Sequence, residues 1–218
     1  KILKAFDRAI DVIDQISEMA EIPATGIVFR VPIIGQLDHR NVGLGRIHTV
    51  RHAAHALANA DVRTVAVCLL WSFKNPAHER RVREIFHREA PEIEISLSSD
   101  VIPIIREYER TATTAINAYL CSVIGTYIGR LQTGLQDKGL KGPFLIMNSI
   151  GGVVTADEAP NKAVTLLTSG PTGGVVGSLS LGKVLGHSHI ITTDMGGTSF
   201  DVGLIVEGRP LLSTITTV

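Results

Sequence analysis

The fold class follows from residues 62–97, which read VRTVAVCLLWSFKNPAHERRVREIFHREAPEIEISL. Residues 62–71 are almost continuously apolar and rich in valine, which is typical of a central strand covered on both faces. The dipeptide Asn75-Pro76 is a strong signal for a helix start, and residues 92–97 return to a strand pattern. Since a further helix is expected over residues 49–60, this order of helices and strands predicts an α/β fold, with a parallel sheet and a crossover helix.

Composition and charge exclude several classes of protein. The 218 residues contain 21 Lys plus Arg and 21 Asp plus Glu, so the chain has neither the basic face that nucleic acid requires nor a polybasic run for an anionic membrane. With 44% hydrophobic residues and 21 glycines, it has the composition of a folded protein with a buried sheet and tight turns. Cys68 and Cys121 do not make a disulfide framework, and no secretory signal is visible. We therefore expect a cytoplasmic protein whose two thiols are not bonded to each other.

The rest of the chain predicts further helices and strands. Residues 1–20 carry apolar side chains every three to four positions, which predicts an amphipathic helix. A long helix is expected between the capping residues at 98–100 and Gly139, with room for a break near Gly125 or Gly129. Its apolar stripe comprises Ile105, Tyr108, Ala112, Ile116, Tyr119, Val123, Tyr127, Leu131 and Leu135. A strand over residues 143–148 is expected to be buried in the same parallel sheet.

The sharpest chemical signal is the stretch ITTDMGGTSFDVGLI at residues 191–205. One strand delivers Asp194 to a glycine turn and the next carries Asp201 back, so the hairpin places two carboxylates beside amides that can face an anion. Such a pair suits a hydrated Mg²⁺ that accompanies phosphate groups. An ordinary hairpin with acidic caps is the alternative interpretation. The expected phosphate donors are the amides and hydroxyls of Gly196, Gly197, Thr198 and Ser199.

Two other glycine-rich stretches could contact a ligand. Ser169 and Gly170 open a helix predicted to reach Leu185, and a helix N-terminus can bind an anion. Close packing of small residues against the sheet is the alternative for this stretch. The turn at residues 148–152 follows a strand, at the edge where open α/β sheets bind ligands, or is only a loop.

Other polar residues are better explained by structure. His48, His52 and His55 share one helical face but lack a further zinc ligand nearby, which favours a solvated or partner-facing surface. Glu79 lies in the first turn of its helix and is expected to act as a cap and surface charge. Arg110 interrupts the apolar face of the long helix, which predicts a buried polar network or a contact with the other half of the fold.

Four ordered blocks of this sequence resemble the hydantoinase A and oxoprolinase family of the actin-like ATPase superfamily. The blocks are VAVCLLWSFKNPAHERRVREI (65–85), SLSSDVIPIIREYERTATTAINAYL (96–120), NSIGGVVTADEAPNKAVTLLTSGPTGGVVGS (148–178) and TTDMGGTSFDVGLI (192–205). The resemblance implies a partial actin-like ATPase fold of the ribonuclease H-like type, a mixed sheet flanked by helices. Residues 1–150 would form part of the first lobe, and residues 151–218 would begin the second lobe with its glycine phosphate loop.

The same resemblance implies ATP and Mg²⁺ as cofactors. Asp194 and Asp201 would act on the metal through water, and residues 196–198 would hold the phosphates. Family members open hydantoins, N-methylhydantoins or 5-oxoproline, which implies an ATP-dependent cyclic amide hydrolase that activates the carbonyl by phosphoryl transfer. An acetone or acetophenone carboxylase subunit is one alternative, and a nucleotide-binding module without its own turnover is another.

The resemblance also implies a hetero-oligomer with a B-type subunit, acting on a small cyclic amide or ketone. Members of the family carry another phosphate loop near their N-terminus, and this chain has none. We therefore expect this chain to be an internal part of a longer protein. By itself it should not turn over ATP, because only half of the groups that position the phosphates are present.

Overall fold

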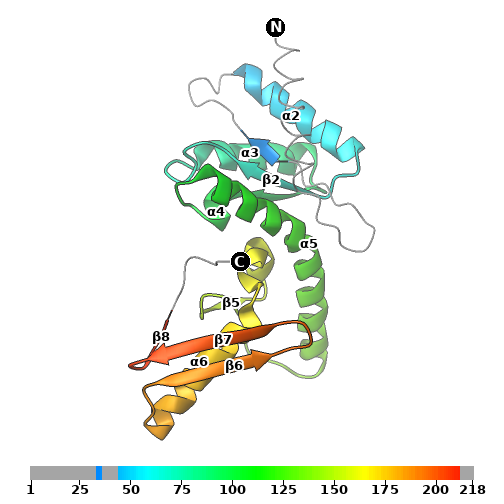
Figure 1. Ribbon diagram of the computed structural model, residues 1–218. Helices are drawn as coiled ribbons and strands as arrows, with labels where there is room; N and C mark the ends of the chain where they lie inside the picture. Colours follow the sequence, from blue (N-terminus) through cyan, green and yellow to red (C-terminus); the bar gives the residue numbers. More distant parts are fainter. Residues whose placement is uncertain (1–32, 36–43, 212–218) are drawn as a thin grey trace. The chain divides into compact units, whose positions relative to one another are not determined.

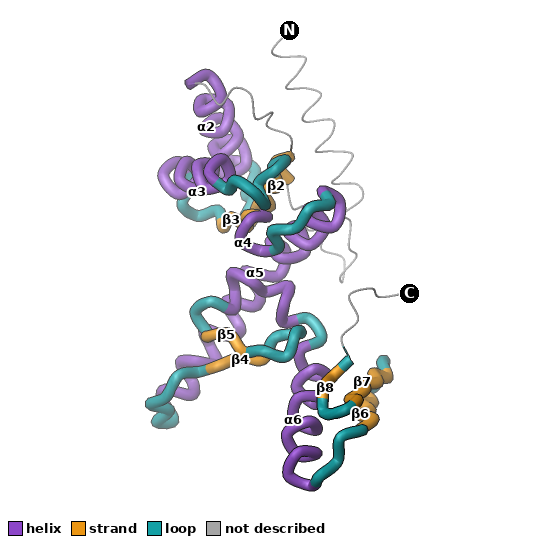
Figure 2. Tube along the Cα trace, turned by 90° about the vertical axis from the view of Figure 1, so that its left-hand side faces the viewer, coloured by secondary structure: helices purple, strands orange, loops and turns teal. Residues whose placement is uncertain are grey.

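A computed structural model describes residues 33–35 and 44–211 of the protein (Figures 1 and 2). The helix expected over residues 1–20 lies outside the described residues, as does the rest of the chain before β1. The described chain divides into two compact units. The first unit comprises the residues up to Tyr127 with Pro160–Val164, and the second comprises Ile128–Ala159 with the residues from Thr165 onwards. The division into lobes at residue 150, expected for the longer family fold, stays a prediction.

The first unit is built on a parallel sheet of three strands in the order β1–β2–β3. The strands are β1 (Ile33–Gly35), β2 (Thr64–Cys68) and β3 (Glu94–Leu97). The helix α3 (Ala77–Glu89) connects β2 to β3, and Val65 lies opposite Ile95 in the parallel register. The crossover predicted from residues 62–97 is therefore confirmed.

Both faces of β2 are covered, which explains its almost continuous apolar sequence. Val65, Val67 and Leu69 face a core that also contains buried side chains of α3 and of α2 (Leu44–Asn59). On the other face, Ala66 and Cys68 pack against Ala118 of the long helix α5 (Glu107–Asp137). Figure 2 shows α2 and α3 together on one side of β2 and β3.

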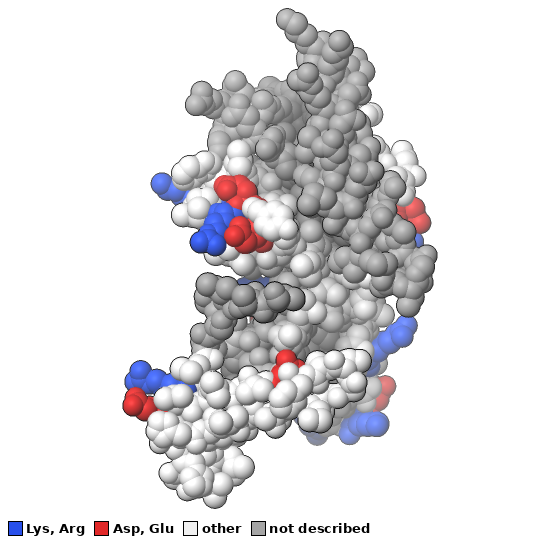
Figure 3. All heavy atoms as spheres, in the orientation of Figure 1, with Lys and Arg blue, Asp and Glu red and all other residues white. Residues whose placement is uncertain are grey.

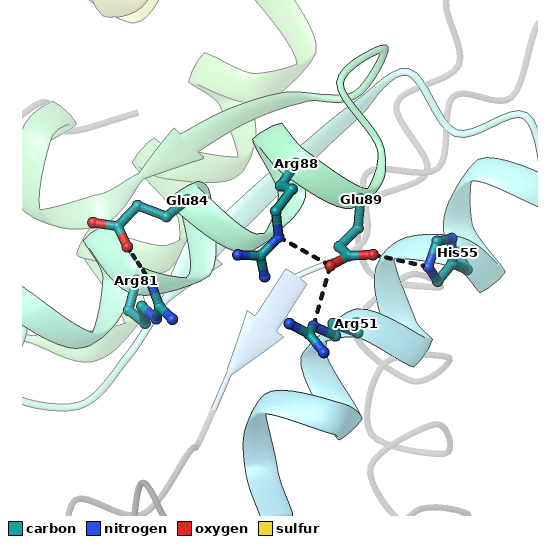
Figure 4. A network of polar contacts seen from close by, with 6 residues as sticks. All are labelled: Arg51, His55, Arg81, Glu84, Arg88 and Glu89. Carbon is teal, nitrogen blue, oxygen red and sulfur yellow. Dashed lines mark hydrogen bonds and ion pairs between the residues drawn. The ribbon is translucent and has the colours of Figure 1, made fainter. Parts of the chain in front are cut away.

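A half-buried carboxylate links α2 to α3 (Figure 4). Glu89 of α3 contacts Arg51 at 3.1 Å and His55 at 3.3 Å, both from α2, and its neighbour Arg88 at 3.1 Å. The hydrogen bond from Arg88 and the charges of Arg51, Arg88 and His55 lower the pKa of Glu89, against the effect of desolvation. A second pair in the same view, Arg81 with Glu84, lies on the outer surface of α3.

The long helix begins later than the sequence predicted. Residues Ser98–Val101 form the short helix α4, and α5 starts only at Glu107. Pro103 and Arg106, whose φ is 87°, separate the two, because proline restricts the residue before it and a left-handed residue cannot continue a helix. α5 then runs without the break considered at Gly125 or Gly129. Its end is as predicted: Gly139 has a φ of +93° and Leu140 N–H donates to the Leu135 carbonyl at 3.0 Å.

The second unit contains two small antiparallel sheets. In the first, β4 (Leu145–Met147) pairs with β5 (Val153–Thr155). The prediction that residues 143–148 form a buried strand of the parallel sheet is therefore wrong, and Leu145 is 48% exposed. The turn that follows β4 returns the chain at once, so the strand finds an antiparallel partner close by. Residues Ala159–Leu166 form a 3-10 segment with a kink at Lys162.

The second sheet has the order β6–β7–β8 and is antiparallel throughout. Its strands are β6 (Ile190–Met195), β7 (Phe200–Val206) and β8 (Arg209–Pro210), and α6 (Ser169–Leu185) packs against it (Figure 1). A Cβ at Gly203 would overlap Val175 of α6 and Thr192 of β6, so glycine at this position allows the close approach. The opposite face of β6 and β7 is apolar and exposed, and Figure 3 shows this surface almost without charged side chains.

Candidate functional site

The hairpin of β6 and β7 places the two predicted metal-binding carboxylates side by side. Asp194 and Asp201 are direct cross-strand partners, one pair before the last pair of the hairpin, Met195 with Phe200. Directly opposite residues project from the same face of a sheet, with Cβ atoms about 4.5–5.5 Å apart. The expected antiparallel arrangement of the two strands is confirmed, and the role of the carboxylates stays a prediction.

The turn between the strands differs in one respect from expectation. The N–H of Gly196 donates to the carbonyl of Ser199 at 3.0 Å, so the expectation of free amides at residues 196–198 is wrong for Gly196. This bond closes the turn. The amides of Gly197 and Thr198 have no hydrogen-bond partner among the residues that the structure describes. Two donors of the turn are therefore open to a ligand.

Neither glycine of this turn has a positive φ, so backbone conformation does not require glycine at these positions. A Cβ at Gly196 would make only ordinary contacts with Ser199 at 3.7 Å, and a Cβ at Gly197 would meet nothing within 4 Å. No protein atom fills the space beside Gly197. Because glycine has no side chain, the backbone of this turn can be approached closely by a ligand.

The structure brings together the two other glycine-rich stretches within the second unit. The hydroxyl of Thr172, in the first turn of α6, donates to the Ser149 carbonyl at 3.1 Å. The helix starts after Thr168, which has a φ of 59° and makes no side-chain capping bond, so the amides of Ser169 and Gly170 are uncapped. Binding of a phosphate by these two residues stays a prediction.

The turn at residues 148–152 is explained by its own geometry. The side-chain oxygen of Asn148 accepts hydrogen bonds from the amides of Ile150 at 3.1 Å and Gly152 at 2.9 Å. Gly151 adopts a φ of +85°, which favours glycine, and it lies against Val176 of α6. The loop interpretation therefore accounts for the shape of this turn and for Gly151, and a substrate contact there stays a prediction.

Glu79 is buried, which corrects the expectation that it is a surface charge. Its carboxylate accepts hydrogen bonds from Leu69 N–H at 2.8 Å, the Ser98 hydroxyl at 2.7 Å and Ser99 N–H at 2.8 Å. Leu69 directly follows β2, and Ser98 and Ser99 begin α4 directly after β3, so one side chain of α3 links the segments that follow both strands. The sequence offered no signal for this role beyond the position of Glu79 in the first turn.

The buried polar network predicted for Arg110 is confirmed. Its guanidinium is fully buried, donates to the Leu69 carbonyl at 2.8 Å and lies 5.5 Å from the centre of the Phe73 ring. Sequence reasoning missed Asn117, one further buried residue of α5. Its amide donates to Ser96 at 3.0 Å and to the Asn161 carbonyl at 3.1 Å, and accepts from Val164 N–H at 3.1 Å. Glu79, Arg110 and Asn117 thus hold the first unit together and are not part of the hairpin site.

The described residues contain no group of three side chains that could hold a metal ion. His55 instead pairs with Glu89, and the side chain of His48 lies outside the described part. Both cysteines are free, as predicted. Burial, followed by the hydrogen bond to Glu94, raises the pKa of Cys121 to about 12, which makes it a packing residue rather than a nucleophile. Within the described chain, no helix is both long and apolar enough to cross a bilayer.

Two family models match the chain. The hydantoinase/oxoprolinase model matches residues 110–218, and the hydantoinase/oxoprolinase N-terminal region model matches residues 34–90. Together they include β2, α3, most of α5 and the hairpin, and β3 lies between the two matched ranges.

Curated relatives extend this likeness. The chain is 40% identical to the acetophenone carboxylase gamma subunit of Aromatoleum aromaticum, over 72% of this chain and 22% of that protein. It is 37% identical to the caprolactamase subunit alpha of Pseudomonas jessenii, over 68% of this chain and 21% of that protein. It is 34% identical to the 5-oxoprolinase of Saccharomyces cerevisiae, over 74% of this chain and 12% of that protein. The chain therefore spans less than a quarter of the length of these relatives.

Solved structures agree with the sequence relatives. A nucleotide-free acetone carboxylase, described in a study of ATP-dependent acetone carboxylation, matches with a TM-score of 0.65 and 38% identity, over 75% of this chain and 23% of that one. The ATP-dependent caprolactamase from Pseudomonas jessenii matches with a TM-score of 0.65 and 32% identity, over 84% of this chain and 25% of that one. The expectation of a partial actin-like ATPase fold of mixed α/β class is confirmed.

Proposed function

Because the chain belongs to the hydantoinase/oxoprolinase family, we propose that it forms part of the ATP site of an enzyme that activates the carbonyl group of a small cyclic amide. The observation that carries this proposal is the β6–β7 hairpin. It combines two facing carboxylates, Asp194 and Asp201, with the unpaired amides of Gly197 and Thr198. The ATP dependence of the acetone carboxylase and caprolactamase structures supports the choice of nucleotide.

The two carboxylates favour a cation at the hairpin. Like charges directly opposite each other on neighbouring strands destabilise a sheet, and a cation between them removes the repulsion. Mg²⁺ accepts one or two carboxylates together with water and phosphate oxygens, so Asp194 and Asp201 fit its requirements through water. When bound, Mg²⁺ would neutralise the phosphate charge. The amides of Gly197 and Thr198 would then hold phosphate oxygens, with the hydroxyls of Thr198 and Ser199 beside them.

The chemistry explains why ATP is needed. The carbonyl carbon of an amide is a weak electrophile, and opening a five-membered lactam releases little energy. Transfer of the γ-phosphoryl group to the carbonyl oxygen breaks the bond to ADP and makes that oxygen a leaving group. Addition of water to the carbon would give a tetrahedral intermediate, from which the ring nitrogen leaves as a protonated amine as the C–N bond breaks. A second water would then hydrolyse the resulting acyl phosphate to a carboxylate and free phosphate. The part of this chain is to position the phosphates and stabilise their charge.

A carboxylase subunit is the second candidate function. The acetophenone carboxylase gamma subunit and the acetone carboxylase beta subunit of Xanthobacter autotrophicus, 37% identical over 84% of this chain, favour it. In this case ATP would activate a ketone or bicarbonate at the same hairpin. Relatives named as subunits also support a hetero-oligomer, and we propose a B-type subunit as the partner.

The test is phosphate release by the full-length enzyme with a panel of hydantoin, 5-oxoproline, caprolactam, acetone and acetophenone. Asp194→Asn should lower kcat by about a hundredfold or more and leave the fold intact, since it removes one electrostatic stabiliser. Asp157→Asn, at an exposed position of the same unit, is the control and should retain wild-type rates. Near-normal activity of Asp194→Asn would contradict the proposal. Phosphate release that none of these compounds changes would favour a nucleotide-binding module instead.

A further inference from the structure

The helix α6 packs against the face of the hairpin that carries the two carboxylates. A Cβ at Gly203 would lie 2.4 Å from the side chain of Val175, so α6 covers this face of β7. Because side chains alternate along a strand, Asp201, two positions before Gly203, projects from the same face. Asp194 is directly opposite Asp201 and also projects from this face. Both carboxylates therefore project toward the side of the sheet on which α6 lies.

The direction of α6 brings its first turn toward these carboxylates. Near the end of α6, a Cβ at Gly182 would overlap Ile190, which begins β6 at the open end of the hairpin. Val175, two helical turns earlier, lies against Gly203, which is two residue pairs nearer the hairpin turn. Asp201 lies about 7 Å further in this direction, and the first turn of α6 begins about 9 Å before Val175. The start of α6 and the carboxylate pair are therefore at the same end of this packing.

The hydroxyl of Thr172 holds the first turn of α6. It lies 3.1 Å from the carbonyl oxygens of both Ser149 and Thr168, which share its proton. Ser149 belongs to the turn at residues 148–152, whose shape Asn148 fixes through its two hydrogen bonds. Thr168 has a φ of 59°, a left-handed conformation that is strained for a residue other than glycine. One hydroxyl thus connects a strained helix entry to an ordered turn.

We propose that Thr172 is a positioning residue for the phosphate site of the hairpin. The proposal rests on the proposed function, because it concerns the same phosphates and Mg²⁺. The bond to Ser149 fixes the start of α6 against the turn at residues 148–152, and the contact of Val175 with Gly203 fixes α6 against the hairpin. Without the hydroxyl, the start of α6 can shift, and the carboxylates beside it lose their fixed position. A displacement of about 1 Å at such a site can lower a rate roughly a hundredfold.

Hydrogen exchange in the ligand-free, full-length enzyme tests the coupling directly. Thr172→Val keeps the shape of the side chain and removes the hydroxyl, whereas Thr172→Ser keeps the hydroxyl. The amides of β6 and β7 should exchange about threefold faster or more in Thr172→Val, and at the wild-type rate in Thr172→Ser. Thr133→Val is the matched control. Thr133 is exposed on α5 and makes the same type of bond, 3.0 Å to the carbonyl of Gly129 four residues earlier, so its loss should leave the hairpin unchanged.

The affinity for Mg·ADP, measured by isothermal titration calorimetry, separates positioning from a loss of folded protein. Thr172→Val should raise the Kd about tenfold and lower kcat for phosphate release about tenfold, with Thr172→Ser and Thr133→Val within about twofold of the wild type. A purely structural role would reduce the fraction of folded enzyme and therefore the binding stoichiometry, without changing the Kd. Asn148→Ala loosens the same link from its other end. Its effect on the Kd should not add to that of Thr172→Val, because both act through Ser149.

Four results would overturn the proposal: wild-type exchange and Kd in Thr172→Val, equal effects of Thr172→Val and Thr172→Ser, equal effects of Thr172→Val and Thr133→Val, or additive effects of Thr172→Val and Asn148→Ala. A failure of the proposed function gives a different result. If Asp194→Asn keeps the wild-type Kd and kcat, the hairpin is not the nucleotide site, and both proposals fail. If Asp194→Asn is impaired while Thr172→Val is normal, only the positioning role of Thr172 is wrong.

Discussion

Replacing Glu79 by Gln should destabilise the protein strongly although the two side chains have almost the same shape. The carboxylate accepts three hydrogen bonds, two at one oxygen from Leu69 N–H and the Ser98 hydroxyl, and one at the other oxygen from Ser99 N–H. An amide has one oxygen and one NH₂ group. In either orientation of the Gln side chain, at least one of the buried donors would face another donor and lose its partner.

The expected cost can be estimated from these bonds. A buried donor without a partner costs about 1–3 kcal/mol, and the remaining bonds lose the contribution of a charged acceptor, so Glu79→Gln should cost about 2–4 kcal/mol in total. That is a large part of the stability of an average domain, roughly 5–15 kcal/mol. The control is Glu84→Gln on the same helix. Glu84 is exposed, and its one ion pair within the described chain is with Arg81, so removal of its charge should change stability by at most about 1 kcal/mol.

Urea unfolding followed by circular dichroism measures both variants. If the dependence of the unfolding free energy on urea concentration is unchanged, the unfolding midpoint of Glu79→Gln should fall by about 1 M urea or more. The midpoint of Glu84→Gln should stay within a few tenths of 1 M of the wild-type midpoint. If Glu79→Gln unfolds at the wild-type midpoint, the buried carboxylate is not what holds the ends of β2 and β3, and the assignment of its three bonds is wrong.

Two further predictions concern the second unit and the buried thiol. Gly203→Ala should destabilise the protein by about 1–3 kcal/mol in the same urea assay, because its Cβ would overlap the stiff side chains of Val175 and Thr192. The control Gly197→Ala adds its Cβ in open space and should leave stability unchanged. Equal stability of the two variants would contradict the close packing of α6. Cys121, with a pKa of about 12, should react with iodoacetamide at pH 8 roughly a thousandfold more slowly than an ordinary thiol, since so little thiolate is present. Glu94→Gln should speed the reaction, because it removes a charge that raises this pKa, and unchanged kinetics would refute that cause.

The elements that the sequence predicted correctly are those with strong local signals. Residues 62–97 combine an apolar β-branched run with an Asn-Pro helix start, and the structure has the parallel strands and crossover helix in that order. The hairpin at residues 191–205 has two alternating strands around a glycine turn, and Asp194 lies opposite Asp201 as this spacing requires. In both places, local propensity and tertiary structure favour the same conformation.

The errors arise where residues outside the strand or helix itself decide the structure. Residues 143–148 have the apolar sequence of a buried strand, but only the turn after Asn148 determines that β4 pairs with β5 and stays at the surface. Glu79 has the sequence position of a capping or surface charge. Its burial depends on donors from Leu69, Ser98 and Ser99, which lie ten to twenty residues away in the chain. The hydrophobic periodicity of a helix gives no information on hydrogen-bond partners at that distance along the chain.

The helix α5 shows most clearly what hydrophobic periodicity reports. The spacing of apolar residues correctly identified an apolar side of α5, which Arg110 interrupts. Within the described chain, however, the parallel sheet packs against the side of α5 that carries Arg110, Asn117 and Ala118. The polar residues Arg110 and Asn117 are buried there because strand ends and the 3-10 segment offer them backbone carbonyls. Since burying such groups is costly without partners, these hydrogen bonds favour the side of α5 that faces the sheet, although the Nε of Arg110 has no partner among the described residues. The apolar side is then left for another element to cover, so a pattern of this kind indicates two interfaces on one helix.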